Sequence, residues 1–502
     1  DTFENKIYPT DRQFFGSEWT PGIDNDVHLY LIYAKSLGSH IAGYFAAVDE
    51  IPPQAYQYSN AHEDFMVAAS QPLDATYTYG VLAHEFQHMI HWAKDRNEES
   101  WLNEGFSELA VDLNGFGRGD KAFLYAAQPN TMLTDWPTDP NKRDVHYGVA
   151  YMFVKYYLDR FGEKATQALV SDQRNGLDSI DGTLRDLNET DPSTGKIITA
   201  DDLFSDWAVA NFLQDPNVGD GRYSYKDYHD APKFNETESI SSCPSNPQDL
   251  SVDQYGVEYI RISCRGNYTL KFEGSSEVGI LPTDAHSGNY AYWSNKGDDS
   301  DMTLDQTFDF SSVKGSVNID YWTWYDLEKD YDYTYLEASQ NRQDWQILTT
   351  SSCTKDNPSG NSYGCGYNGT SNGWREENVD LSKFAGSKVT LRFEYITDPG
   401  VNGEGLLVDD ISIPAINYRT DFEKDDGGWK SAGFVRIQNS LPQNFLLSLI
   451  QEGSKETVKK LQLNNDNTLS LPLKLDSDAI LVVSGSTRFT RQPASYRLSV
   501  ER

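Results

Sequence analysis

The amino-acid sequence predicts a multidomain protein in which an α+β domain is followed by two all-β domains of the jelly-roll or β-sandwich type. The chain has 502 residues, a length that suits two to four domains. Apolar residues at helical spacing are confined to about the first 230 residues, where strand-like runs precede them. After Ala231, short alternating runs of Val, Ile, Tyr, Trp and Leu are separated by Gly, Asn, Asp and Ser, which is typical of β-sandwiches.

The α+β domain is predicted at residues 1–235. Its strands are expected in the runs DVHLYLIYA and EDFMVAAS, which lead into a helical half. The helices are expected in three later stretches that carry apolar residues three and four positions apart: residues 76–95, 99–113 and 146–162.

The β-rich remainder divides into a central block and its two flanks. Residues 284–414 are rich in strand-like runs and long enough for one jelly-roll domain. The flanking segments, 236–283 and 415–502, are also strand-like, but the first is too short to bury a core alone. The sequence therefore predicts one discontinuous β-sandwich domain with the central block inserted into it.

The net charge limits the classes of binding partner that we expect, and the cysteine content indicates the compartment in which the protein works. The net charge of −34 would repel phosphate backbones and anionic lipid headgroups, and no apolar run has the roughly 18 residues that a membrane helix needs. We therefore expect no nucleic-acid partner and no membrane insertion. The cysteines form two close pairs, Cys243 with Cys264 and Cys353 with Cys365, which predicts two local disulfides and a secreted, extracellular protein.

The sharpest chemical signal is an H-E-x-x-H motif at residues 84–88, inside a stretch with helical spacing. Residues four apart share one helical face, so the imidazoles of His84 and His88 can reach one Zn²⁺. Glu85 follows His84 and is expected to point toward the attacking water. Catalytic zinc usually takes three protein ligands, so a third ligand is expected elsewhere.

Three arrangements compete for that third ligand. His91 lies on a similar face, but three ligands on one unbroken helix would spread over about 10 Å, too far for bonds of about 2 Å. Metzincin peptidases break this helix with a glycine and place the last ligand three residues later, but this chain has His91 and Lys94 at those positions. The remaining candidate is Glu104 in WLNEGFSE, because a carboxylate from a neighbouring helix can complete a His₂Glu site.

The two motifs together resemble a known group of enzymes. The motif HEFQH followed by WLNEGFSELA is similar to the gluzincin metallopeptidases, and its local sequence most resembles the hyicolysin-like secreted peptidases. The resemblance covers roughly residues 25–215. The resemblance implies that His84, His88 and Glu104 bind zinc and that Glu85 is the general base and later the proton donor.

The same resemblance implies further parts of an active site. Glu108, four residues after the third ligand, would support His84. An edge strand beside the site would pair with an extended peptide, and we expect that strand within residues 59–70. The stretch DVHYGVAY sits where zinc aminopeptidases carry a catalytic tyrosine, which implies that Tyr147, or alternatively His146, stabilises the oxyanion of peptide hydrolysis.

Acidic residues in the β block are candidate calcium ligands, since Ca²⁺ prefers oxygen ligands clustered in loops. They are Asp298, with its neighbours in GDDSD, and the adjacent pair Asp409 and Asp410. The block resembles the jelly-roll modules of immune inhibitor A peptidases in SGNYAYWSNKGDDSD and GLLVDDISIP, and this resemblance implies bound calcium at Asp409 and Asp410. The alternating aromatic residues from 321 to 335 fit a carbohydrate-binding platform or, as we prefer, a half-buried core strand.

Together these features predict a secreted zinc metalloendopeptidase that acts on proteins or peptides and uses zinc and calcium. One alternative is a zinc aminopeptidase, but the sequence has no G-x-M-E-N motif, with which aminopeptidases of this group bind the substrate amine. A second alternative is an adhesion or glycan-binding protein with an incidental peptidase domain, which would contact carbohydrate or a cell surface through its β domains.

Overall fold

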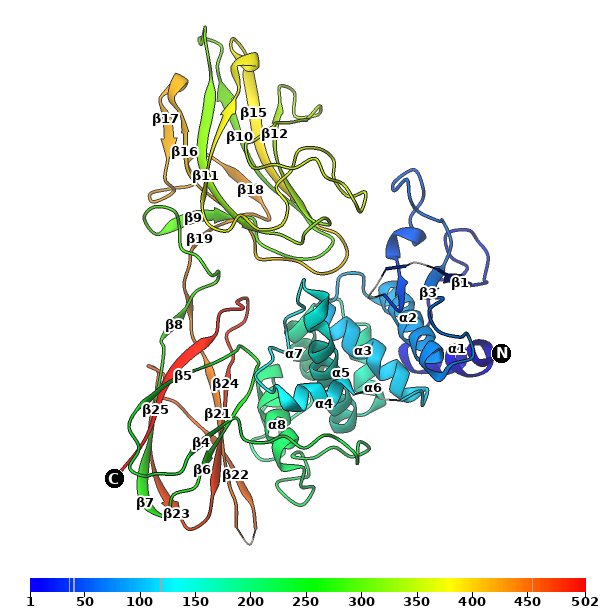
Figure 1. Cartoon of the computed structure of the whole chain (residues 1–502), viewed down its shortest axis with the longest axis vertical. Coiled ribbons are helices and arrows are strands. Elements are labelled where there is room, and N and C mark those ends of the chain that lie inside the picture. The colour runs from blue at the N-terminus through cyan, green and yellow to red at the C-terminus, as the bar shows by residue number, and fades with distance from the viewer. Residues whose placement is uncertain (36, 39–40, 118–119, 454) are drawn as a thin grey trace. The chain divides into compact units, whose positions relative to one another are not determined.

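The chain folds into two compact units (Figure 1). The first unit comprises residues 1–278 and 442–502, and the second comprises residues 279–441. In the described part of the chain, the α-helices lie in the first unit, and the second consists of strands with two short 3₁₀ turns. The structure is a computed structural model that describes residues 1–35, 37–38, 41–117, 120–453 and 455–502.

The helices of the first unit follow one another along the chain and pack as neighbours. Helix α2 packs against α3, and α5 packs against both α3 and α4. None of the helices in the described residues has the length and apolar character needed to cross a lipid bilayer. The helices are α1 (Tyr8–Phe15), α2 (Thr76–Lys94), α3 (Ser100–Leu113), α4 (Lys121–Ala127), α5 (Arg143–Phe161), α6 (Glu163–Val170), α7 (Gly176–Asp186) and α8 (Ala200–Leu213), with short π or 3₁₀ turns at Phe3–Ile7, Ala47–Glu50 and Pro140–Lys142.

Helices α2 and α3 are held in place by apolar faces and by one close approach. Fully buried side chains recur in α2 at helical spacing: Ala83, Phe86, Met89 and Ile90. In α3, a Cβ at Gly105 would lie 3.0 Å from the carbonyl oxygen of Ala150 in α5. The missing side chain therefore sets how deeply α3, and with it Glu104, sits against the other helices.

A small sheet precedes α2. It contains β1 (Tyr30–Ala34), β2 (Gly43–Phe45) and β3 (Asp64–Ala68) in the order β1-β3-β2. Strand β3 pairs parallel with β1 and antiparallel with β2. The segment 59–70 therefore provides the central strand rather than the edge strand that we expected, because both β1 and β2 hydrogen-bond to it. The edge strand that packs against α2 is β2.

The rest of the first unit is a β-sandwich built from both ends of its discontinuous chain. One sheet has the order β22-β21-β24-β6-β4 and the other β23-β7-β25-β5. Strands from before the second unit pair with strands from after it, as β6 does with β24 and β7 with β23. The bounds are β4 (Glu238–Ile240), β5 (Gln248–Val252), β6 (Glu258–Ile262), β7 (Gly266–Gly274), β8 (Glu277–Val278), β20 (Leu441–Pro442), β21 (Phe445–Gln451), β22 (Thr457–Leu461), β23 (Thr468–Leu475), β24 (Ala479–Gly485) and β25 (Ala494–Glu501).

The second unit is also a two-sheet structure. Its sheets have the orders β13-β12-β15-β10-β18 and β14-β11-β16-β9-β19, and β17 pairs with β16. The bounds are β9 (Tyr290–Trp293), β10 (Asp301–Asp309), β11 (Asn318–Asp326), β12 (Tyr333–Ser339), β13 (Gln346–Ile347), β14 (Arg375–Asp380), β15 (Lys388–Ile396), β16 (Gly405–Ile413), β17 (Tyr418–Thr420), β18 (Lys430–Ala432) and β19 (Val435–Gln438), with 3₁₀ turns at Ser382–Phe384 and Pro414–Ile416.

The second unit extends further along the chain than the predicted block 284–414. Strands β17, β18 and β19 follow that block, yet they hydrogen-bond to β16, β10 and β9 of the second unit. They therefore complete its sheets rather than those of the flanking sandwich. Of the alternating aromatic residues, Tyr321, Tyr325, Tyr333 and Tyr335 are buried, as a core strand requires, whereas Tyr331 is exposed.

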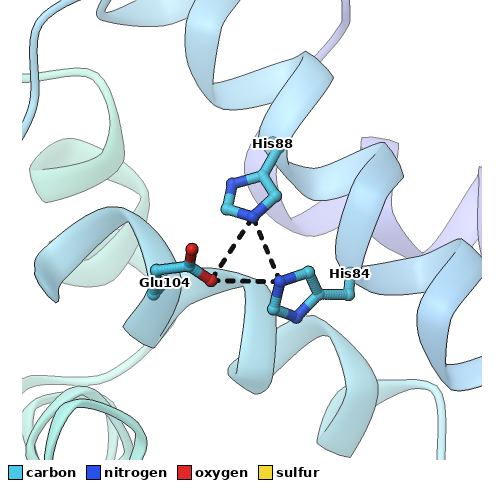
Figure 2. A group of neighbouring side chains, drawn as sticks. All are labelled: His84, His88 and Glu104. Atoms are coloured by element: carbon cyan, nitrogen blue, oxygen red, sulfur yellow. Dashed lines mark hydrogen bonds and ion pairs between the residues drawn. The ribbon is translucent and has the colours of Figure 1, made fainter. Parts of the chain in front are cut away.

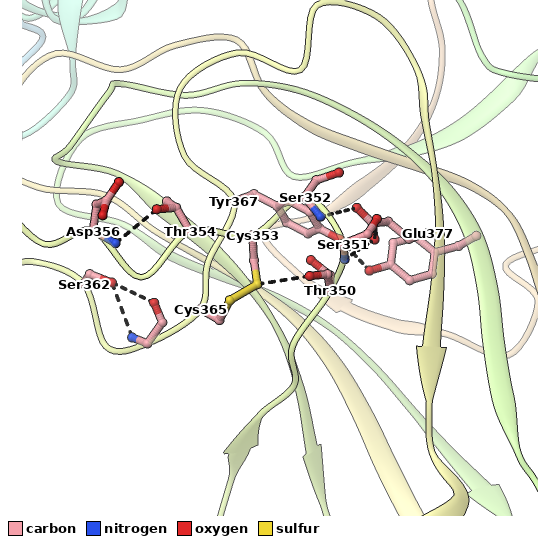
Figure 3. The surroundings of a disulfide bond; sticks show 12 residues. Thr350, Ser351, Ser352, Cys353, Thr354, Asp356, Ser362, Cys365, Tyr367 and Glu377 are labelled. Carbon is pink, nitrogen blue, oxygen red and sulfur yellow. Dashed lines mark hydrogen bonds between the residues drawn. A yellow bond between two sulfur atoms is a disulfide. The ribbon is translucent and has the colours of Figure 1, made fainter.

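Both predicted disulfides are present, Cys243–Cys264 in the first unit and Cys353–Cys365 in the second. Figure 3 shows the second bond beside the carboxylate of Glu377. That carboxylate accepts hydrogen bonds from the backbone N–H groups of Ser351, at 2.7 Å, and Ser352, at 3.1 Å. The disulfide and the buried carboxylate thus hold the same loop.

Candidate metal centre and active site

Helices α2 and α3 bring His84, His88 and Glu104 together (Figure 2). The Nε2 atoms of the two histidines are 3.1 Å apart. Oε2 of Glu104 lies 3.1 Å from Nε2 of His84 and 3.5 Å from Nε2 of His88. Three ligand atoms around a tetrahedral ion with bonds of about 2.1 Å would lie about 3.4 Å apart. The triangle of donor atoms therefore has the size of a zinc site.

Neighbouring acceptors set the tautomer of both imidazoles. Nδ1 of His88 lies 3.1 Å from Oδ1 of Asn103 and 3.1 Å from Oγ of Ser107. Nδ1 of His84 lies 3.5 Å from Oε1 of Glu108. With acceptors facing Nδ1, each ring in its neutral form carries its proton there and presents a lone pair on Nε2. Two lone pairs and a carboxylate oxygen thus converge, a donor set that suits a divalent cation.

The electrostatics of the cluster also favour a positive charge at its centre. Burial alone lowers the pKa of His84, but the carboxylates of Glu104 and Glu108 outweigh burial and raise that pKa to about 10. Burial alone raises the pKa of Glu104, but the two imidazoles lower it far below its usual value. Oε2 of Glu104 is buried and lies close to both rings. A metal ion would satisfy these donors together.

Glu85 is buried beside the cluster and faces the edge strand β2. Burial raises the pKa of its carboxyl, and the imidazoles of His84 and His88 partly offset that rise. The backbone of Phe45 in β2 hydrogen-bonds to this carboxylate. At Gly43 a Cβ would lie 3.1 Å from Cγ of Glu85, so the glycine lets β2 approach the helix. A carboxylate with a raised pKa next to a reacting water is suited to general-base catalysis.

Tyr147 lies next to the cluster on α5. Its ring centroid is 6.0 Å from that of His84 and 4.9 Å from that of Trp136. Burial raises the pKa of Tyr147 well above its usual value, and the carboxylates of Glu104 and Glu108 raise it further. The phenol therefore keeps its proton and can donate a hydrogen bond at neutral pH.

His146 also packs against Trp136. The two ring centroids are 6.3 Å apart, and Nδ1 of His146 is buried without a hydrogen-bond partner. Burial lowers the pKa of His146, and Asp135 partly offsets that effect. Of the two residues expected to stabilise an oxyanion, the structure brings only Tyr147 into ring contact with His84.

Lys121, at the start of α4, is a part of the site that the sequence did not reveal. Its Nζ lies 2.7 Å from Oε1 of Glu108 and 3.7 Å from the ring centroid of Tyr147. Gly148 permits this arrangement, because a Cβ there would collide with the carbonyl group of Lys121. A glycine inside an otherwise regular helix was the one signal that could have indicated a close helix contact at this point.

The sequence-predicted calcium ligands fall into two places in the second unit. Asp409 accepts a hydrogen bond from the backbone of Ser287 at 3.1 Å. Asp410 lies 2.7 Å from Nδ1 of His286 and accepts from Oγ of Ser287 at 3.0 Å. Asp409 and Asp410 are thus engaged by protein groups.

Asp298 lies near a different group of acidic residues that the sequence did not single out. Glu328, Asp332 and Asp398 each offer one carboxylate oxygen, and these oxygens lie within 4.8 Å of one another. Burial, together with the negative charge of Asp298, raises the pKa of Asp332 to about 8 and that of Asp398 to about 6. Three carboxylate oxygens therefore lie close enough together for one cation to contact them all.

The second unit is similar to a known family. The family model "Immune inhibitor A-like, MAM domain" matches residues 269–439, about a third of the chain. The match begins within β7 and ends next to β19, so it covers the strands of the second unit.

Three bacterial proteins are similar to parts of the chain. Pre-pro-metalloprotease PrtV of Vibrio cholerae is 29% identical over 149 residues, which are 30% of this chain and 15% of PrtV. Immune inhibitor A of Bacillus thuringiensis is 33% identical over 152 residues, 30% of this chain and 21% of that protein. Neutral metalloprotease ShpI of Staphylococcus hyicus is 24% identical over 228 residues, 40% of this chain and 50% of ShpI. The chain therefore spans at most half the length of these relatives.

Proposed function

We propose that the protein is a secreted zinc-dependent metalloendopeptidase of the gluzincin type. The observation that carries this proposal is the convergence of His84, His88 and Glu104 from two helices into one buried triangle. The similarity to PrtV and ShpI, both named as metalloproteases, supports the same reaction class. The two disulfides support an extracellular setting.

The residues around the triangle divide the chemistry of peptide hydrolysis among them. Zinc bound by His84, His88 and Glu104 would polarise the scissile carbonyl and the attacking water. Glu85 takes a proton from that water and delivers it to the leaving amine. Tyr147 donates a hydrogen bond to the oxygen on which negative charge develops.

We propose that the substrate binds as an extended peptide along β2. This strand pairs with β3 on one side only among the described residues, and its Phe45 contacts Glu85. An added strand would gain main-chain hydrogen bonds at that edge and bring a peptide bond beside the carboxylate. Such pairing needs no free amino terminus, which favours internal cleavage over removal of terminal residues.

The substitution Glu85→Gln tests this function. We expect it to retain zinc and to lower the rate of peptide hydrolysis by about 10²- to 10⁴-fold, because the amide cannot accept the proton. Zinc content and the digestion of a peptide library, with the products sequenced, measure the two effects. Stepwise release of amino-terminal residues by the unmodified protein would indicate an aminopeptidase instead.

Glu50→Gln is a matched control for this experiment. Glu50 is a buried glutamate of the same unit, and burial raises its pKa to about 8, so the amide replaces a largely protonated carboxyl. We expect the control to keep full activity. An active Glu85→Gln protein would contradict the assigned role of Glu85.

We also propose that the second unit binds calcium at Glu328, Asp332 and Asp398. The donor set is entirely oxygen, which Ca²⁺ prefers. The buried carboxylates repel one another, and a bound cation would relieve that repulsion.

A further inference from the structure

A second cluster of metal-ligating side chains lies at the carboxyl end of α2, apart from the proposed catalytic zinc site. His91, Asp95 and Glu98 bring one ring nitrogen and two carboxylate oxygens within 4.8 Å of one another. His91 is on the last turn of α2, Asp95 follows that helix directly, and Glu98 lies in the connection to α3. All three side chains are buried, with exposed fractions of 1%, 3% and 8%.

The imidazole of His91 presents a lone pair that no protein group uses. Its Nδ1 lies 2.9 Å from Oδ1 of Asn103, which accepts the ring N–H. Nε2 is therefore the unprotonated nitrogen of the neutral ring, and burial lowers the pKa of His91 to about 4, which keeps the ring neutral. Nε2 is buried and has no hydrogen-bond partner. A buried nitrogen in this state is costly unless something binds it.

The two carboxyl groups differ in their partners, since both oxygens of Glu98 accept hydrogen bonds, Oε2 from Oγ of Ser179 at 3.2 Å. Oδ2 of Asp95 is buried without a hydrogen-bond partner. Oε1 of Glu98 accepts backbone N–H groups from Gly176 at 2.6 Å and from Glu99 at 2.6 Å, which fixes the side chain in place. Among the described residues, no lysine or arginine forms an ion pair with Asp95 or Glu98. Burial raises the pKa of Glu98 to about 8 and also raises that of Asp95.

We propose that His91, Asp95 and Glu98 bind a second zinc ion in a buried structural site. A nitrogen lone pair and two carboxylate oxygens form a donor set for a divalent transition metal, whereas Ca²⁺ and Mg²⁺ prefer oxygen alone. The ion would supply the positive charge that the cluster lacks. It would also tie the end of α2 to the connection that leads into α3.

One side chain links this site to the proposed catalytic zinc. Oδ1 of Asn103 faces Nδ1 of His88 at 3.1 Å and Nδ1 of His91 at 2.9 Å. A single amide thus sets the tautomer of one ligand in each site and leaves Nε2 of each neutral ring able to bind a metal. The second site does not depend on the proposed peptidase activity, since its three residues are not part of the reaction.

Zinc content measures the second site directly. The protein is produced with zinc as Glu85→Gln, which prevents self-digestion, and is desalted in calcium-containing buffer so that the oxygen-only cluster takes calcium. We expect two zinc ions per chain. Replacing Asp95 by Asn and Glu98 by Gln together should leave one, because the amides keep the shape but lose the charge. The separate pair His84→Gln and His88→Gln should also leave one, and Glu50→Gln should leave two.

The outcomes separate this inference from the proposed function. A parent protein with one zinc, lost on replacing His84 and His88 but kept on replacing Asp95 and Glu98, would overturn the second site. One zinc with the opposite pattern would support the second site and refute the catalytic one. If the Asp95 and Glu98 pair does not fold, His91→Gln replaces it, with the same expected loss of one ion. Two ions in a folded His91→Gln protein would likewise overturn the inference.

Discussion

Tyr147 is the residue whose proposed role can be isolated most cleanly, because phenylalanine removes only its hydroxyl. Burial and the carboxylates of Glu104 and Glu108 keep that hydroxyl protonated, so it can donate to a developing oxyanion. We expect Tyr147→Phe to lower kcat about 10²-fold with a smaller change in KM, since the bond forms mainly in the transition state. Steady-state kinetics on one peptide substrate measures both.

Tyr125→Phe is the control for that substitution. Tyr125 is a fully buried tyrosine on α4 whose hydroxyl has no hydrogen-bond partner, so its loss should leave kcat unchanged. Equal kcat for Tyr147→Phe and the unmodified protein would show that Tyr147 only packs against Trp136.

The individual ligands could be anticipated from the sequence where spacing along one helix decides the geometry. Four residues separate His84 from His88, so any helix places them on one face. Asn103 and Lys121 could not be anticipated in the same way. Asn103 matters because it lies between two histidines of another helix, and Lys121 because α4 packs onto α5 beside Gly148. These contacts arise from tertiary packing between helices, which leaves little trace in the local sequence pattern.

At the scale of elements, the acidic loops of the second unit predict how its stability depends on pH and calcium. Burial raises the folded-state pKa of Asp332 to about 8 and that of Asp398 to about 6, above the usual value of 3.8. The folded state therefore holds protons that the unfolded state has released. Without calcium, the stability of the second unit should fall as pH rises from about 4 to about 8. Calcium should restore it at pH 8 by binding the folded state.

Thermal unfolding in zinc-containing buffer, with and without calcium, measures this effect. We expect Asp332→Asn to weaken both the pH dependence and the response of the melting temperature to calcium. The matched control is Asp409→Asn, because Asp409 is also buried with a pKa raised to about 7 but does not belong to the group of Glu328, Asp332 and Asp398. A calcium response that disappears with Asp409→Asn and persists with Asp332→Asn would place the site at the adjacent aspartates instead.

In the small sheet, the sequence predicts a strand but not the position of that strand in the sheet. Alternation in EDFMVAAS identified a strand, and β3 occupies Asp64–Ala68 within it. The position of that strand in the sheet depends on β1 and β2, which come from other parts of the chain. The three-residue strand β2 is too short to give a pattern of its own, yet it is the strand that reaches Glu85.

At the scale of the whole molecule, the order of α+β and β-rich parts followed from composition and periodicity. The sequence pattern changes from helical to strand-like near Ala231, and the structure agrees, because the last described α-helix ends at Leu213 and the strands of the β-rich part begin at Glu238. The end of the second unit was harder to find. Strands β17 to β19 look like any other β sequence, and only their pairing with β9, β10 and β16 assigns them to the second unit.

The zinc triangle is the feature on which the proposed activity depends. X-ray diffraction from crystals of the Glu85→Gln protein, recorded at the zinc absorption edge, tests it most directly. We predict an anomalous peak about 2.0–2.2 Å from Nε2 of His84, Nε2 of His88 and the carboxylate of Glu104. A zinc-loaded crystal with no peak at that position, or with the Glu104 carboxylate turned away from the ion, would contradict the account.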